Sequence, residues 1–159
     1  MSLLNRFLAP IAAVLVVAAG VTLPSAFSIA GEYFEKGGVA LHGYDPISYF
    51  TDAKPVRGNP DHRAEHKGSQ FLFASKRNLE TFKADPERYA PQYGGYCAFG
   101  MASGYKAATD PNAFSIVDGK LYLNCNRDVQ KQWTADIPGF IVKADAAWPT
   151  ASKLSKVHE

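Results

Sequence analysis

The chain has 159 residues and a formal net charge of +2, with 47% hydrophobic and 20% charged residues. This composition is typical of one globular domain and excludes an intrinsically disordered chain. The lysines and arginines form no basic tract, and nucleic acid binding needs concentrated positive charge to displace counterions. We therefore expect no nucleic-acid partner.

The first thirty residues have the pattern of a secretory signal peptide. Arg6 is the only charge before Glu32, an apolar run covers residues 7–23, and Ser28 and Ala30 supply small residues at the −3 and −1 positions. This pattern predicts cleavage after Ala30 and a periplasmic location. An uncleaved membrane anchor facing the periplasm is the alternative, because the apolar run is nearly long enough to cross a bilayer. The membrane is a partner only in that case.

Residues 31–149 are then expected to form a single domain, followed by a polar, flexible tail at 150–159. The predicted fold class is α+β, a small antiparallel sheet of β-hairpins with packed helices. Asp45 and Pro46 fit either a turn or a helix start, with Asp45 as the cap and Pro46 at the first helical position. Residues 51–66 have the composition of a loop, with a short strand expected at the end of this stretch, up to His66.

Three further local patterns predict a hairpin, a helix and a second hairpin. A turn at residues 67–69 joins short strands that end at His66 and begin at Gln70. Ser75 caps a helix that Asp85-Pro86 ends or follows with a second turn. Asp118-Gly119 suits a two-residue turn between two β-rich runs, because glycine accepts a positive φ.

Two more helices are expected near the C-terminus. Asn126 or Asp128 can cap the first of them, over residues 129–136. Ile137-Pro138 opens the second, which is predicted to reach about Trp148.

The chain has two cysteines, Cys97 and Cys125, and three interpretations stay open. They can form a disulfide, Cys97 can serve as a metal or redox thiol with Cys125 as its resolving partner, or both can be inert buried thiols. A disulfide needs Cα atoms within about 7 Å, which the sequence does not fix. The seven residues before Cys97 contain no lysine, arginine or histidine to lower its pKa.

The predicted metal ligands are Cys97, Met101 and His42. Met101 follows Cys97 by four residues and shares a face with it if the segment is helical, and a thiolate with a thioether suits Cu(I). His42 can fold toward Cys97. Packing is the alternative role for all three. The pair His62 and His66 lies in a predicted strand and loop, where the spacing of four residues brings no advantage.

The remaining composition gives weaker functional signals. We expect the many tyrosines and both tryptophans to form core instead of a cofactor pocket. Gly94 and Gly95 favour a tight turn over a close approach to a ligand or strand. The chain contains no nucleophile elbow, zinc-protease helix, phosphate loop or Cys-x-x-Cys motif, so nothing indicates an enzyme.

Four stretches together resemble the YHS domain family in its exported bacterial form, some of whose members are similar to selenoproteins. They are GYDPISYF, FLFASKRNLETFKADPERYAPQYGGYCAFG, SIVDGKLYLN and DIPGFIVKADAAWP. The resemblance implies a small binding or accessory module that handles a metal, with copper as the suggested cofactor. A metal ion or a periplasmic protein is the expected partner.

Departures from the family pattern limit what the resemblance implies. Metal-linked members carry cysteine where this chain has Ser48, Ala74 and Asn78. The resemblance therefore carries over the scaffold and not a copper-ligand set. It also implies that Cys97 belongs to the family pattern and that Cys125 does not, so Cys97 is the thiol that we expect to be functional. A thiol-redox protein using both cysteines, and a structural or protein-interaction domain with a Cys97–Cys125 disulfide, are the alternatives.

Overall fold

The computed structural model describes residues 32–159, so the expected signal peptide at residues 1–30 lies outside the described part. The strands are β1 (Glu35–Lys36), β2 (Val39–Ala40), β3 (Asn59–His66), β4 (Ser69–Phe73), β5 (Lys106–Ala107), β6 (Asp110–Val117), β7 (Lys120–Asn124) and β8 (Val157–His158). The helices are α1 (Ser48–Thr51), α2 (Lys76–Ala84), α3 (Pro86–Tyr89), α4 (Ala98–Ala102), α5 (Arg127–Thr134) and α6 (Ile137–Ala151), with short 3₁₀ turns η1 (Leu41–Gly43) and η2 (Gln92–Gly95).

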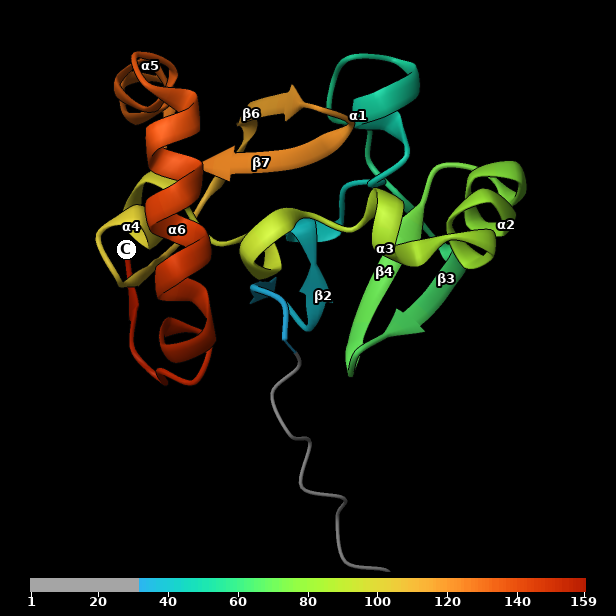
Figure 1. The fold of residues 1–159 in the computed structure, drawn as a ribbon. Coiled ribbons are helices and arrows are strands. Elements are labelled where there is room, and N and C mark those ends of the chain that lie inside the picture. The colour runs from blue at the N-terminus through green and yellow to red at the C-terminus, as the bar shows by residue number, and fades with distance from the viewer. Residues whose placement is uncertain (1–31) are drawn as a thin grey trace, which may run out of the picture.

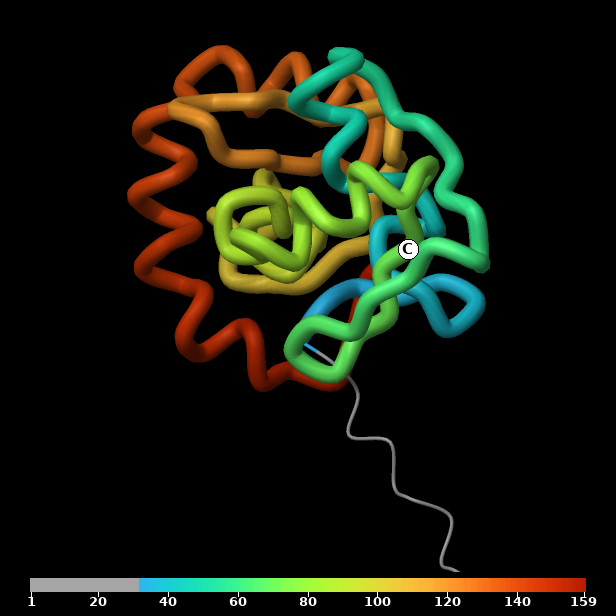
Figure 2. The backbone as a smooth tube through the Cα atoms, turned by 90° about the vertical axis from the view of Figure 1, so that its right-hand side faces the viewer, coloured from blue at the N-terminus to red at the C-terminus, as the bar shows by residue number. Residues whose placement is uncertain are grey.

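These elements form the predicted α+β class. In the described part of the chain, β1–β2, β3–β4 and β6–β7 pair antiparallel, while β5 and β8 pair parallel. Helices α4 and α5 lie beside the β6–β7 hairpin and α6 packs on both of them, while α2 lies beside β3–β4 and α3 contacts α2 and β7 (Figure 1). Seen from the side, α6 runs along one edge of the molecule (Figure 2). Within residues 32–159 no helix is both long and apolar enough to span a bilayer.

Short-range signals placed most of the elements correctly. The Ser75 side chain accepts the N–H of Asn78 at 3.1 Å and begins α2. The Asn126 side chain accepts the N–H of Val129 at 2.9 Å and begins α5. The Asp118-Gly119 turn joins β6 to β7, with φ values of 49° and 72°. Each signal acts within four residues, which is why the sequence reveals it.

The structure corrects two predicted boundaries and decides between two alternatives at a third place. Strand β3 begins at Asn59, inside the predicted loop, and accommodates its proline through a register irregularity between Asn59 and Arg63. Of the two alternatives at Asp45-Pro46 the structure has the turn: Pro46 and Ile47 form it, the N–H of Ile47 donates to the Asp45 carboxylate at 2.8 Å, and helix α1 begins at Ser48. Helix α6 continues past its predicted end and contains Pro149.

The core consists of two clusters that share strand β7. Leu121 and Leu123 pack into a cluster with the aromatic side chains of β4 and α2, while Tyr122 packs into a second cluster with Trp133. Alternate residues of a strand point to opposite faces, so one five-residue strand serves both clusters. As predicted, most of the aromatic residues are core.

The C-terminal segment returns to the domain. Strand β8 pairs with β5, and the N–H of Ala108 donates to the carbonyl of His158 at 2.8 Å. Part of the segment expected to be a flexible tail is thus paired beside the chain that follows α4.

Candidate functional site

The two cysteines meet where the end of β7 reaches the start of α4. Cys97 immediately precedes α4, and Cys125 immediately follows β7. The backbone of Cys97 forms an isolated parallel β-bridge with Leu123, and its N–H donates to the carbonyl of Ala107 at 3.1 Å. Backbone pairing on both sides therefore fixes the position of Cys97.

The two side chains are free thiols and lie beside each other. The N–H of Cys125 donates to Sγ of Cys97 at 3.1 Å. Cys97 has no exposed surface, whereas Cys125 is half-buried. The fully buried Asn124 adds a weak contact, with Oδ1 at 3.9 Å from Sγ of Cys97. Cys125 is therefore the cysteine nearer to solvent, although from the sequence we expected Cys97 to be the functional thiol.

Hydrogen bonding makes Cys97 the more acidic thiol. A hydrogen bond from the Cys125 thiol is the largest cause that lowers the pKa of Cys97, from its ordinary 9.0 to about 7. Burial is the second-largest cause and raises the pKa, whereas backbone N–H groups of Gly100, Cys125 and Phe99 lower it further, so that the hydrogen bonds together outweigh burial. The same pairing, together with burial, raises the pKa of Cys125. The pair therefore holds one proton near neutral pH, and the two thiols titrate as a unit.

A cavity of ≈ 370 Å³ opens in front of Cys125. His42 lies in its wall, together with Phe34, Thr109, Asn126 and Glu159. The Nε2 atom of His42 is buried and has no hydrogen-bond partner among the described residues. Burial, followed by the charge of Lys36, lowers the pKa of His42, so its ring is neutral at pH 7. His42 thus lines the approach to the thiol pair.

The predicted metal ligands do not assemble into a metal centre in the described residues. Met101 lies in the predicted helical segment, and its N–H bonds to the carbonyl of Cys97 at 2.8 Å. Its side chain is fully buried in the cluster around Trp133, where packing explains it. Residues 32–159 contain no group of three or more His, Cys, Asp and Glu side chains placed to hold a metal ion. The histidines at 62 and 66 lie in β3, and His66 Nε2 approaches Glu87 at 3.3 Å.

The positions that carry cysteine in metal-linked relatives surround a buried carboxylate here. Asp45 is fully buried, and its Oδ2 accepts the N–H of Ala74 at 2.8 Å and the Nδ2–H of Asn78 at 2.6 Å. Ser48 Oγ donates to the Asp45 carbonyl at 2.7 Å. Because these donors satisfy the carboxylate, the arrangement serves to hold α1, β4 and α2 together.

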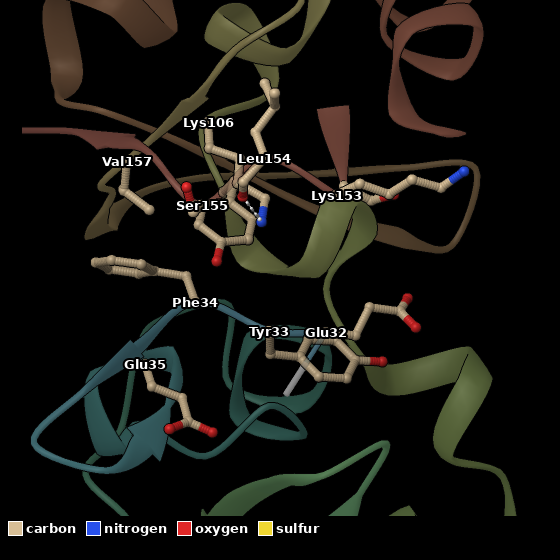
Figure 3. Close-up of a pocket in the computed structure, with 11 residues that line it drawn as sticks. Glu32, Tyr33, Phe34, Glu35, Lys106, Lys153, Leu154, Ser155 and Val157 are labelled. Atoms are coloured by element: carbon tan, nitrogen blue, oxygen red, sulfur yellow. Dashed lines mark hydrogen bonds between the residues drawn. The ribbon is translucent and has the colours of Figure 1, made fainter. Parts of the chain in front are cut away.

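A larger cavity, of ≈ 520 Å³, has neither cysteine in its wall, and it shares Phe34 and Glu35 with the cavity at Cys125 (Figure 3). Lys106 projects into it, donates to the carbonyl of Leu154 at 2.8 Å and lies 4.8 Å from the centre of the Tyr96 ring. Burial lowers the pKa of Lys106. The wall also contains Glu32 and Glu35. Carboxylates and an ammonium share this cavity, so it does not select one ligand charge.

Comparison with protein families assigns one segment of the chain. Residues 47–93 match the YHS domain model. The match covers 47 of the 159 residues. Such domains are associated with metal handling, copper in particular. Comparison with curated proteins and with solved structures gave no match.

The matched YHS segment includes Ser48, Ala74 and Asn78 but ends before the thiol pair. His42, Cys97, Met101 and Cys125 all lie outside it. The sequence also gave no reason for the acidity of Cys97. Its donors are backbone N–H groups and a thiol 28 residues away, and neither leaves a motif.

Proposed function

We propose that this protein is an exported thiol-redox module in which Cys97 and Cys125 alternate between dithiol and disulfide. The main support is that the two cysteines lie next to each other, since the backbone N–H of Cys125 donates to Sγ of Cys97 at 3.1 Å. The pKa of Cys97 is also lowered to about 7. Thiolate is the reactive form of cysteine, and a lowered pKa maintains it at neutral pH. Export would place the pair where disulfides form and persist.

The reaction consists of two exchanges with an external disulfide, RSSR. The proton that the pair shares moves to Cys97, so that Cys125 attacks one sulfur of RSSR as the thiolate, forms a mixed disulfide and expels one thiolate, which takes up that proton. The Cys97 thiolate then attacks the Cys125 sulfur, forms the internal disulfide and expels the second thiolate. The protein loses two electrons, and RSSR gains them and leaves as one thiol and one thiolate.

Equilibration with mixtures of oxidised and reduced dithiothreitol tests this proposal. After each mixture, free thiols are alkylated and the protein mass is measured, with Cys97→Ser and Cys125→Ser as controls. In the wild type we expect the number of alkylated thiols per chain to change reversibly between two and zero at one potential. Neither single-cysteine variant should show this change. A folded wild-type protein that keeps both thiols even in a large excess of oxidised dithiothreitol would contradict the proposal.

Copper(I) binding by the same two sulfurs is a second candidate. Two adjacent soft sulfurs suit Cu(I), and the YHS domain adds support from the association of its family with copper. Titration against a Cu(I)-selective chromophoric chelator measures it. We expect one Cu(I) per chain, lost in either cysteine variant and kept in Met101→Leu. Equal copper retention by Cys97→Ser and the wild type would exclude this role.

A further inference from the structure

We propose that the cavity between residues 32–35 and 152–157 binds a short peptide, with the peptide carboxylate at Lys106 and the peptide ammonium at Glu35. Neither cysteine lines this cavity, so the inference goes beyond the proposed thiol-redox function and does not depend on it. It assigns a ligand class, a small zwitterion with separated charges, to a cavity that the redox reaction does not use.

The first observation is that two segments far apart in sequence face each other across this cavity. Residues 32–35 form one wall, while residues 152–157 and Lys106 form the opposite wall (Figure 3). The N–H of Phe34 donates to the carbonyl of Gly94 at 2.7 Å, and strand β8 pairs with β5. Backbone hydrogen bonds therefore hold both walls, and the cavity is part of the fold.

The second observation is that Lys106 is a buried ammonium without a carboxylate partner. The residue is only 8% exposed, and its Nζ atom donates to the neutral carbonyl of Leu154 at 2.8 Å. None of the ion pairs within residues 32–159 includes Lys106. Burial alone lowers its pKa, so no carboxylate of the described chain lies close enough to raise it.

This ammonium therefore has capacity for a ligand. An ammonium carries three N–H donors, and the bond to Leu154 uses one of them. Buried charges in proteins are normally paired, because an unpaired charge costs free energy when it leaves water. Figure 3 shows the Lys106 nitrogen beside Leu154, between the two walls. A carboxylate bound in the cavity would supply the missing partner.

The third observation is that Glu35 brings an unpaired negative charge to the same cavity. Within residues 32–159 Glu35 forms no ion pair, whereas Glu32 pairs with Lys67 at 3.7 Å. The Nζ atom of Lys106 lies 4.8 Å from the centre of the Tyr96 ring. Burial, followed by the charge of Glu35, raises the pKa of Tyr96, so the carboxylate lies near the same tyrosine. The two opposite charges thus share a neighbour but do not reach each other.

These two charges determine the ligand class. A ligand with only a carboxylate or only an ammonium would leave one of the protein charges without a partner, whereas a zwitterion pairs with both. Hydrogen bonds between charged groups are the stronger ones, so each pairing adds affinity. In a free amino acid the two charged groups share one carbon, whereas at least one peptide unit separates them in a short peptide. The separation of Lys106 from Glu35 therefore favours a peptide.

The size and lining of the cavity agree with this class. Its volume of ≈ 520 Å³ lies within the range of about 300–1,000 Å³ typical of sites for small molecules. Phe34, Leu154 and Val157 provide apolar wall for a peptide side chain. Ser152 and Ser155 provide hydroxyl groups, which can both donate to and accept from a peptide unit.

The test uses the full chain at neutral pH and the dipeptide Ala-Phe as the probe. Binding is followed by NMR through the backbone N–H signals. Three further ligands each change one feature of the probe: N-acetyl-Ala-Phe lacks the ammonium, the amide of Ala-Phe lacks the carboxylate, and phenylalanine lacks the separation of the charges.

Three variants test the protein side of each contact. Lys106→Gln removes the ammonium and keeps a donor for the Leu154 carbonyl, and Glu35→Gln removes the carboxylate. Lys153→Gln is the matched control for Lys106→Gln, because Lys153 also lines the cavity but is exposed and points away from Lys106 (Figure 3).

We expect Ala-Phe to shift the signals of residues 32–35 and 152–157. Each of the three altered ligands should bind the wild type at least about tenfold more weakly, the effect of losing one hydrogen bond between charged groups. Lys106→Gln should lose the preference for Ala-Phe over its amide, and Glu35→Gln should lose the preference over the acetylated form. Lys153→Gln should match the wild type.

The inference is overturned if Ala-Phe leaves these signals unchanged, or if the amide or the acetylated form binds the wild type as tightly as Ala-Phe does. Equal binding by phenylalanine would overturn the assignment to a peptide. An unchanged affinity in folded Lys106→Gln would also overturn it. The ligand comparisons need only the wild type, so they decide the question even if a variant does not fold.

Discussion

The N–H of Cys125 donates to Sγ of Cys97, so the residue that follows strand β7 stabilises the charge on the residue that precedes helix α4. The Cys125 thiol reinforces this bond, and the first backbone N–H groups of α4 add to it. The acidity of Cys97 thus depends on one contact between two distant segments. Charged residues are not its source.

Removing the Cys125 side chain should raise the pKa of Cys97. In the wild type we expect one thiolate to form with a midpoint at about pH 7, followed through its absorbance at 240 nm. In Cys125→Ala the largest cause of the lowered pKa is gone and burial remains, so the midpoint should move toward 9.0. Met101→Leu is the control and should keep the wild-type midpoint. An unchanged midpoint in Cys125→Ala would show that the backbone donors alone lower the pKa of Cys97, without the Cys125 thiol.

The reduced thiol pair should make stability depend on pH in two directions. The unfolded chain carries two protons on the pair below its ordinary pKa of 9.0, whereas the folded chain releases one near pH 7. Stability should therefore rise from about pH 7 to 9, by roughly 2 kcal/mol. Above pH 9 it should fall, because the raised pKa of Cys125 keeps a proton that the unfolded chain loses.

Urea unfolding of the reduced wild type and of the double variant Cys97→Ala/Cys125→Ala measures this effect. The difference in unfolding free energy between the two proteins isolates the pair from other titrating groups. We expect a maximum of this difference near pH 9. A difference that stays flat between pH 7 and 9 would mean that the folded pair has no lowered pKa.

Replacing Gly94 should destabilise the fold for two reasons at one position. Its φ is +60°, and a Cβ there would collide with the backbone carbonyl oxygen of Glu32. The predicted tight turn and the alternative of a close backbone approach therefore both apply. We expect Gly94→Ala to cost more than the roughly 1–2 kcal/mol of left-handed strain alone. Gly104→Ala, at φ +82° in open space, isolates the strain. Equal losses in urea unfolding would exclude the steric contribution.

The sequence predicted those parts of the fold that depend on neighbours within a few residues. Ser75, Asn126 and Asp118-Gly119 set their elements through local caps and turns, and all three were confirmed. Hairpin β3–β4 was also found, although prolines concealed the start of β3. Local chemistry determines these features, so a single sequence reveals them.

Contacts between distant segments could not be predicted. Cys97 and Cys125 are separated by 28 positions, and β5 pairs with β8 across about fifty residues. The position of His42 in the wall of the Cys125 cavity depends on a left-handed backbone that nothing in its neighbours specifies, apart from the glycine after it. Candidate ligands could be named from the sequence, but which of them share a site depends on tertiary packing.

The carboxylate of Asp45 should stabilise the fold without affecting the thiol pair. Its two oxygens accept N–H groups of Ile47, Ala74 and Asn78 in a fully buried site. In Asp45→Asn an NH₂ group replaces one of the two oxygens and faces N–H donors. The hydrogen bonds to that oxygen are lost, and their donors stay buried without a partner. We expect a loss of about 3 kcal/mol in urea unfolding, since a single bond to a charged group contributes about 1.5–3 kcal/mol.

Exposed Asp52→Asn is the matched control for Asp45→Asn, and it should change stability by less than about 0.5 kcal/mol. The thiol pair lies outside residues 47–93, so the folded Asp45→Asn protein should keep the Cys97 midpoint at about pH 7. A loss of stability with an unchanged midpoint would establish that the YHS segment supports the fold while the thiols form a separate site. A midpoint that moves together with stability would instead show that the two are coupled, because the buried carboxylate network then helps to hold the end of β7 against α4.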